Sequence, residues 1–534
     1  MPRSAAARAL GVLLLAQGLL LAVLALAGGQ QVALAPGWSL RLPALAEVFD
    51  YAPTEPTAAD SLLESVAADS AQLAVDLRRA YDPSQAKDSP YADSASLDAK
   101  IRLSNPLVGG TTPLDGFFEQ LAAVDDSTVQ LIRIGHYGDS QIEGDRVTMF
   151  LRRKFAEDFG GGGLGLLPIV EPTSHFSLER ACSANWVRNT VFQNRASHSR
   201  YNYGGTVYHY GVGLLARPNP RYKAPVIDST GKWTEVPKDS AGKPEPEFFY
   251  TPTGRMEADI VFRLRSGATY ATARLLWGGE ATTRLRVYQG KDVVYDDTLR
   301  GDGTYHELRL PIAAGTNPVK LRFDGPSPEV YGLVLDPWRG VQVDNLAIRG
   351  HSGNELVRID DGFLAQQLRQ HTVRLLILQY GGNVVPWPVT DASFKWLEDD
   401  LYKNLMRFKR LAPQASILVV GVADMAHKSE GKVTSYASVP LILAAQKRAA
   451  ERAGCAFWDL YSSMGGKGSI IRWVHRTPPM AAADYAHFSF GGQKLVAELL
   501  YKALMNEYTL YRRRILYQTA PPDSASTDSL PPLR

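Results

Sequence analysis

The residues best suited to nucleophilic catalysis lie in two short segments far apart in the sequence. Asp484 and His487 are three residues apart in ADYAHFSFGGQKLVAELL, directly before apolar residues at helical spacing. One turn can carry both side chains to the same side, so the carboxylate could hold the imidazole in one tautomer. The other ring nitrogen could then take a proton from the hydroxyl of Ser140, in the segment GDS. Taken alone, Ser140 is more simply explained as a helix N-cap, and His487 as a solvated surface residue.

Two other residues could stabilise negative charge that develops on an oxygen atom. Asn383 follows the segment RLLILQYGG, and an Asn amide in this position can donate a hydrogen bond to an oxyanion. Gly353, in the segment GHSGN, offers an unhindered backbone N–H, and Gly350 of the same segment competes with it for this role. Each of these residues, taken alone, is also explained as part of an ordinary turn.

The segments that carry these residues follow strands predicted from the hydrophobic pattern. Residues 131–138 form an apolar strand that leads through GDS into an amphipathic helix over residues 147–159. A helix that starts after Ser140 would leave the N–H groups of Ser140 and the next residues as free donors for an anion. Four further apolar strands alternate with amphipathic helices, over residues 341–350, 373–383, 415–424 and 455–461. This alternation predicts an α/β fold with a mostly parallel sheet covered on both faces, whose ligands bind beyond the carboxyl ends of the strands.

The alternation of strands and helices is interrupted by a region with a different hydrophobic pattern. From Glu245 to Gln342, short runs of alternating apolar and polar residues are separated by turn residues, which is typical of an antiparallel β-sandwich. Residues 30–125, rich in Ala, Ser, Asp and Pro, are predicted to be a stalk or linker. The predicted order is then a first α/β part, an inserted sandwich, a second α/β part and a disordered tail, over residues 126–205, 206–342, 343–511 and 512–534.

Residues 1–29 are predicted to be an export signal or a membrane anchor. Arg3 and Arg8 precede an apolar run from Ala9 to Ala27, whose small residues suit a cleavage site for a secretory signal. The run is also long enough to span a bilayer as an uncleaved anchor with its basic end in the cytoplasm. A buried helix of a soluble protein is the third alternative. A signal and an anchor would both place the rest of the chain outside the cytoplasm.

The composition of the 534 residues is that of a globular protein, with 45% hydrophobic and 21% charged residues. Lys and Arg together number 58 and Asp and Glu 55, a net charge of +3 that does not favour a nucleic-acid partner. The two cysteines, Cys182 and Cys455, form no CxxC motif, so a thiolate zinc site is excluded. They could form one disulfide or remain two buried thiols. The histidines lack metal-ligand spacing such as HExxH, so no metal site is predicted.

Taken together, the four segments occur in an order that resembles a known superfamily. GDS, GHSGN, GGN and DYAH followed by FSFGGQKLVAELL resemble the signature blocks of the SGNH (GDSL-like) hydrolases. The resemblance implies a three-layer α/β/α domain with a parallel sheet. It also implies that Ser140 is the nucleophile, His487 the general base and then acid, and Asp484 the residue that orients it. The N–H of Ser140, the N–H of Gly353 and the side chain of Asn383 would form the oxyanion hole. Val384 stands where the superfamily often has Asp.

Within that superfamily, the sequence is similar to exported bacterial peptidoglycan O-acetylesterases, which carry a β-sandwich resembling a carbohydrate-binding module after the first block. FWDLYSSMGGKGSI and PPMAAADYAHFS carry this similarity, although Gln141 replaces a His that often follows GDS. The resemblance implies a periplasmic or envelope-anchored serine esterase that removes O-acetyl groups from a cell-envelope polysaccharide, namely peptidoglycan, without a metal or cofactor. An O-acetyltransferase with the same triad and a non-catalytic glycan-binding protein are the alternatives.

Overall fold

The computed structural model describes residues 31–35, 38–41, 103–211, 215–218, 222, 237, 248–251, 256–265, 269–387, 391–429 and 431–519. The predicted signal or anchor at residues 1–29 lies outside these residues. The chain divides into two units, Met1–Ser61 and Leu62–Arg534. In the first unit, β1 (Gln31–Ala35) and β2 (Trp38–Arg41) form an antiparallel hairpin. No helix within the described residues is long and apolar enough to cross a membrane.

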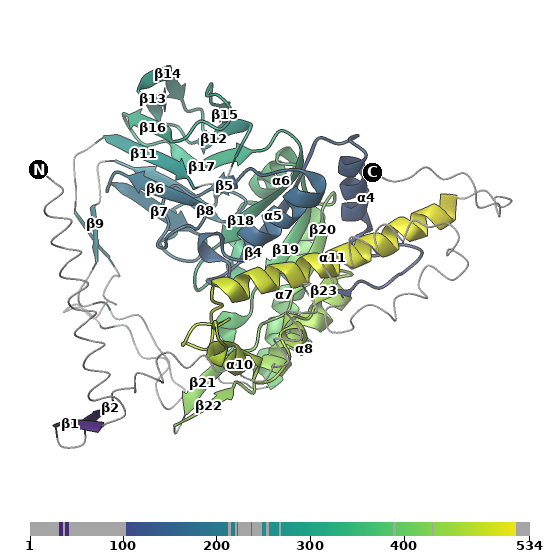
Figure 1. The fold of residues 1–534 in the computed structure, drawn as a ribbon. Helices are drawn as coiled ribbons and strands as arrows, with labels where there is room; N and C mark the ends of the chain where they lie inside the picture. The colour runs from purple at the N-terminus through teal and green to yellow at the C-terminus, as the bar shows by residue number, and fades with distance from the viewer. Residues whose placement is uncertain are drawn as a thin grey trace, which may run out of the picture. The chain divides into compact units, whose positions relative to one another are not determined.

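The centre of the second unit is a six-stranded, mostly parallel sheet (Figure 1). Its strands are almost entirely buried apolar runs, as expected for a parallel sheet covered on both faces. The register aligns Gly138 at the end of β4 with Ala347 of β18 and Gln379 of β19. The segments that follow these three strands therefore start at one edge of the sheet. The strand order is β18 (Gly340–Ala347), β4 (Leu131–Gly138), β19 (Val373–Gln379), β20 (Ser416–Val420), β23 (Ala456–Trp458) and the antiparallel β3 (Leu103–Ser104).

The longer helices form two groups, and members of each contact the parallel sheet. The first group is α4 (Asp115–Asp125), α5 (Thr148–Phe159) and α11 (Phe490–Thr519). The second is α6 (Asp361–Gln370), α7 (Asp391–Leu411) and α8 (Val439–Arg452). Helix α8 shows why these segments are helical, because it buries Val439, Ile442, Ala445 and Ala449 on one stripe at helical spacing. Two shorter helices, α9 (Leu460–Ser463) and α10 (Ser469–His475), lie between β23 and α11 in the sequence.

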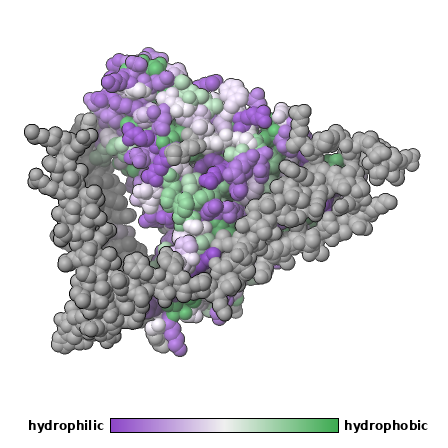
Figure 2. All heavy atoms as spheres, in the orientation of Figure 1, coloured by the Kyte–Doolittle hydropathy of each residue, from purple (hydrophilic) through white to green (hydrophobic). Residues whose placement is uncertain are grey.

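The predicted β-sandwich is present as two antiparallel sheets around one apolar core. Strands β13 and β14 present a mostly hydrophilic outer surface (Figure 2), and the exposed charges of β14 protect this sheet edge from pairing with another chain. The first sheet has the order β14 (Asp292–Arg300), β13 (Thr282–Gln289), β16 (Val319–Asp324), β11 (Glu257–Leu264) and β6 (Leu178–Cys182). The second has the order β15 (Tyr305–Arg309), β12 (Thr272–Gly278), β17 (Glu329–Asp336), β8 (Thr206–Tyr210) and β7 (Trp186–Thr190), and β5 (Gly165–Leu167) pairs with β17.

The insert begins earlier in the chain than residue 206, the predicted boundary. Strands β5, β6 and β7 pair with β17, β11 and β8 of the sandwich. Strand β5 has only three residues, and β6 and β7 are short and of mixed polarity. Because β5 and β6 also pair with strands far along the chain, a local pattern does not reveal them. At the other end, β18 starts at Gly340, inside the predicted insert, and belongs to the parallel sheet.

The α/β part also extends beyond its predicted limits at both ends. Helix α4 and strand β3 lie in the region predicted to be a stalk, yet Phe117, Phe118 and Leu121 of α4 are fully buried. The Ala- and Ser-rich composition of the preceding residues conceals this short amphipathic helix. Helix α11 continues to Thr519, into the predicted disordered tail. Both cysteines are free thiols, Cys182 exposed and Cys455 buried, so no disulfide joins them.

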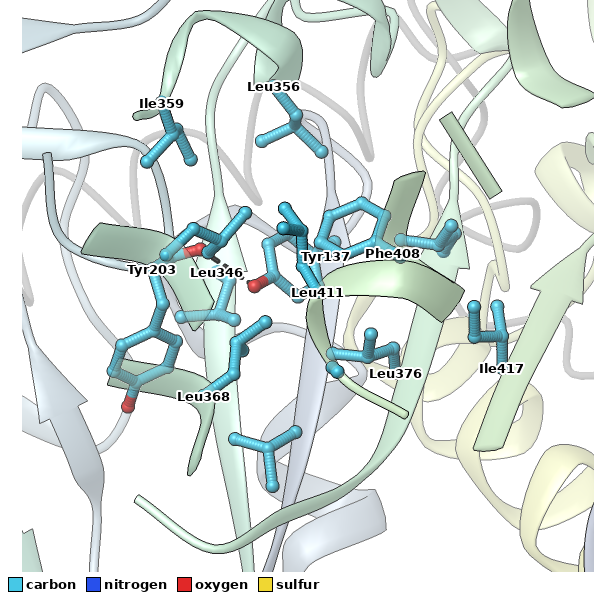
Figure 3. Packing of buried hydrophobic residues seen from close by; sticks show 14 of the residues in the cluster. Tyr137, Tyr203, Leu346, Leu356, Ile359, Leu368, Leu376, Phe408, Leu411 and Ile417 are labelled. Carbon is cyan, nitrogen blue, oxygen red and sulfur yellow. Dashed lines mark hydrogen bonds between the residues drawn. The ribbon is translucent and has the colours of Figure 1, made fainter. Parts of the chain in front are cut away.

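A shared core joins the sandwich to the parallel sheet. Tyr137 of β4 packs beside Leu346 of β18, and its hydroxyl donates to the carbonyl of Tyr203, 2.7 Å away (Figure 3). Nearby, Arg133 of β4 forms buried ion pairs with Asp336 at the end of β17 (2.6 Å) and Asp344 of β18 (2.7 Å). Loss of either partner would leave an uncompensated buried charge, so these pairs restrict movement of the sandwich against the strands that carry the site.

Candidate active site

Ser140 lies in the turn that follows β4, and its hydroxyl oxygen is 2.8 Å from Nε2 of His487. The helix predicted over residues 147–159 is confirmed as α5, which begins at Thr148, but the expectation that Ser140 stands at the start of this helix is wrong, because a short 3-10 turn at Glu143–Asp145 lies between them. The N–H groups that follow Ser140 are therefore not free helix donors. Gln141 N–H donates to the Asp139 carboxylate and Ile142 N–H to the Asp139 carbonyl. The serine side chain thus pairs with an imidazole and caps no helix.

The loop before α11 holds His487 in a defined orientation. Oδ2 of Asp484 is 2.8 Å from Nδ1 of His487, and its Oδ1 accepts the backbone N–H groups of Ala486 (2.9 Å) and His487 (3.0 Å). Burial alone would raise the pKa of Asp484, but these hydrogen bonds outweigh it and lower the pKa below its ordinary value. The carboxylate therefore stays ionised, Nδ1 of the ring carries the proton, and Nε2 is the nitrogen that can accept one from Ser140.

The predicted oxyanion donors come from the loops after β18 and β19. Gly353 has a φ of +96°, and a Cβ on it would lie 2.9 Å from the ring of Tyr380, so both its conformation and the space around it require glycine. Its N–H and that of Ser140 have no hydrogen-bond partner among the described residues. Asn383 is tied into the same place, because its Nδ2 donates to Asp139 (2.9 Å) and to the carbonyl of His351 (3.1 Å).

Asp139 is a member of the site that the sequence reasoning did not single out. It is 2% exposed, and burial raises its pKa to about 6, opposed by the hydrogen bond from Gln141 N–H and by nearby His487. Its two oxygens connect the turn of Ser140 to Asn383. The GDS segment could have indicated this residue from the sequence, because an aspartate directly before Ser140 must lie at the same end of the strand.

Gln141 links the two halves of the site. Its Nε2 donates to the carbonyl of Ala486, 2.5 Å away, so the residue after Ser140 contacts the residue before His487. This side chain therefore holds the loop of His487 against the serine turn. A small cavity of about 10 Å³ lies beside the turn and is lined by Asp139, Gln141, Gly382, Val422 and Met425, among others. Such a volume accommodates about one water-sized group.

Comparisons with known proteins address the fold. No family model matches the chain, and no curated protein matches its sequence. A solved peptidoglycan O-acetylesterase is similar with a TM-score of 0.55 and 19% identity, over 74% of this chain and 96% of that one. An acetyl xylan esterase has a TM-score of 0.24 and 13% identity, over 31% of this chain and 81% of that one, and this score is too low to indicate a shared fold. A family two carbohydrate esterase from Cellvibrio japonicus has a TM-score of 0.21 and 8% identity, over 56% of this chain and 98% of that one, which is also too low to indicate a shared fold.

The similarity to the first structure covers nearly all of that protein, so it includes more than the parallel sheet alone. The parallel sheet with antiparallel β-sheets inserted after its first strand agrees with the architecture expected from the sequence blocks. The chain therefore shares its fold with a solved peptidoglycan O-acetylesterase.

Proposed function

We propose that this chain is an exported serine esterase that removes O-acetyl groups from a cell-envelope polysaccharide, with peptidoglycan as the substrate. The observation that carries the proposal is the continuous hydrogen-bonded line from Ser140 through His487 to Asp484, with both contacts at 2.8 Å. A nucleophile, a base and a group that orients the base are the parts that acyl transfer needs. The proposal includes the three-layer arrangement of SGNH hydrolases, which the two helix groups on the parallel sheet support.

In the proposed reaction, the oxygen of Ser140 attacks the acetyl carbonyl while Nε2 of His487 takes the hydroxyl proton. Asp484 stabilises the imidazolium that forms, and His487 then gives the proton to the departing sugar oxygen. Water, deprotonated by the same nitrogen, then attacks the carbonyl of the acetyl-enzyme. The bond between the acyl carbon and the Ser140 oxygen breaks, His487 returns the proton to that oxygen, and acetate is released.

The oxyanion hole of this proposal uses the N–H groups of Ser140 and Gly353 and the amide of Asn383. Both hydrogens of the Asn383 amide are engaged in the free protein, by Asp139 and by the carbonyl of His351. We therefore expect one of these bonds to be shared with the substrate oxygen when charge develops on it. Removing one donor of this kind typically lowers kcat by about 10²–10³-fold.

Hydrolysis is favoured over transfer to a second sugar by the openness of the site. The side chains of His487 and Asp484 are 36% and 51% exposed, so water can reach the base. A transferase with the same triad must exclude water from the acetyl-enzyme. Export rests on the basic and apolar pattern of residues 1–29.

The test measures acetate release from O-acetylated peptidoglycan and from p-nitrophenyl acetate, by the purified protein and its Ser140→Ala variant. Removing a triad nucleophile should cost several orders of magnitude in rate. Equal melting temperatures for the two proteins would show that the variant is folded. Acetyl transfer to an added oligosaccharide without net hydrolysis would support the transferase instead. Binding of glycan without turnover of either ester would indicate a non-catalytic protein.

A further inference from the structure

The turn that carries the nucleophile holds several charges, and nearly all of them are paired. Asp145 accepts two hydrogen bonds from Arg152, at 2.8 and 2.9 Å. Buried Glu143 accepts from Arg349, at 2.7 and 2.9 Å. Asp139 is bound by Asn383 and by a backbone N–H. The acidic groups of residues 139–146 are therefore satisfied without the help of the remaining charged residue of the turn, Arg146.

Arg146 is a half-buried cation beside the nucleophile that lacks a counter-charge. Its Nη1 donates to the backbone carbonyl of Ser140, 2.8 Å away. Within the described part of the chain, it makes no ion pair and no second hydrogen bond. The carbonyl and hydroxyl oxygens of one serine are a few bonds apart, so the guanidinium lies within roughly 7 Å of the attacking oxygen. A guanidinium has five N–H donors, and four of these remain available to a ligand.

We propose that Arg146 binds a carboxylate of the substrate, so that the site selects acetyl esters on anionic saccharides. This inference rests on the proposed esterase function and names the substrate class of the same site. A planar guanidinium matches a carboxylate and binds it with two parallel hydrogen bonds. A partly buried charge without a partner is costly, and an anionic substrate supplies the missing partner. The carboxylate could stand on the sugar ring or on a peptide attached to it.

The experiment compares anionic with neutral acetyl esters. The anionic substrates are O-acetylated oligogalacturonate, with ring carboxylates, and O-acetylated peptidoglycan, with peptide carboxylates. The neutral ones are O-acetylated xylo-oligosaccharide and p-nitrophenyl acetate. Arg146→Gln should lower kcat/KM about ten- to hundredfold on an anionic substrate, through KM, and less than about threefold on the neutral ones. Arg146→Lys should recover part of the loss, and the anionic preference of the wild type should weaken in high salt.

Arg153→Gln is the matched control. It removes one positive charge from nearby α5, at a side chain that is 66% exposed and outside the site, so it should leave the preference unchanged. Equal losses on all substrates in Arg146→Gln would overturn the inference and show that Arg146 only positions the Ser140 carbonyl. Whichever of the two anionic substrates responds to the substitution identifies the source of the carboxylate.

A binding measurement separates this inference from the proposed function. Calorimetry with unacetylated oligogalacturonate and with deacetylated peptidoglycan fragments needs no turnover. If the protein hydrolyses no ester but binds one of these anions, and Arg146→Gln weakens that binding at least tenfold, the anion site stands and the esterase proposal fails. If esters are hydrolysed but neither anion binds more tightly than its neutral counterpart, the esterase stands and the anion site fails.

Discussion

Replacing Asp139 with asparagine tests how the fold holds a buried carboxylate directly before the serine. Asp139 is 2% exposed, and its oxygens accept from the N–H of Gln141 and the amide of Asn383. Burial outweighs these bonds and raises its pKa to about 6. The folded protein therefore binds the Asp139 proton more tightly than the unfolded chain does. Asparagine keeps the shape and the acceptor for Gln141, but it cannot ionise.

The magnitude follows from linkage. A pKa of about 6 in the folded protein, against 3.8 for an ordinary aspartate, corresponds to about 3 kcal/mol. Below pH 3.8, the group is protonated in both states and its contribution is fully present. As the pH rises through 6, the folded state must ionise a buried group, and this stability is lost. The wild type should therefore lose about 3 kcal/mol relative to Asp139→Asn between pH 3.8 and pH 7.

The assay is thermal unfolding of both proteins at a series of pH values. With an unfolding entropy of about 2.1 cal/mol/K per residue, 3 kcal/mol corresponds to roughly 3 °C in Tm for a cooperative unit of the size of Leu62–Arg534. The amide introduced at position 139 also disturbs the bond to Asn383, but this cost does not depend on pH and shifts the whole curve by a constant. Asp126→Asn, at an exposed position, controls for the loss of a carboxylate that stays in water. A Tm difference between Asp139→Asn and wild type that stays constant across this pH range would refute the reasoning.

Three further predictions concern the site and the thiols. Asp484→Asn should lower kcat by about 10²–10⁴-fold with little change in KM, because the new amide nitrogen cannot accept the Nδ1–H of His487. Steady-state acetate release measures both constants, and a change confined to KM would contradict the prediction. Gly353→Ala should lower kcat about 10²-fold and the free energy of unfolding by about 1–3 kcal/mol, because the new Cβ meets the Tyr380 ring. Gly290→Ala is the control for kinetics and unfolding, because Gly290 also has a positive φ but no atom lies within 4 Å of the added Cβ. Cys182 alone should react with a thiol reagent in the native protein, because Cys182 is exposed, whereas Cys455 is buried and burial raises its pKa to about 11. Labelling of both thiols without denaturant would contradict this prediction.

The sequence by itself determined the class of the fold, because periodicity is a local property. Apolar runs identify β4, β19 and β20 as buried strands, and alternating residues identify β11 to β17 as strands of a sandwich. The limits of the insert were decided by tertiary pairing. Strands β5 and β6 are too short for a pattern, and they are strands only because β17 and β11 offer them partners. Helix α4 likewise depends on burial against the sheet.

For the site, the sequence determined which residue types stand at the strand ends, and therefore which side chains were candidates. It could not determine that Ser140 and His487, 347 residues apart, meet at 2.8 Å, because the distance depends on the register of the parallel strands and the path of the loop before α11. The same holds for Asp139, Gln141 and Arg146. Their types are visible in the sequence, but burial, partners and the absence of a counter-charge are properties of the folded neighbourhood, and only the tertiary structure assigns them.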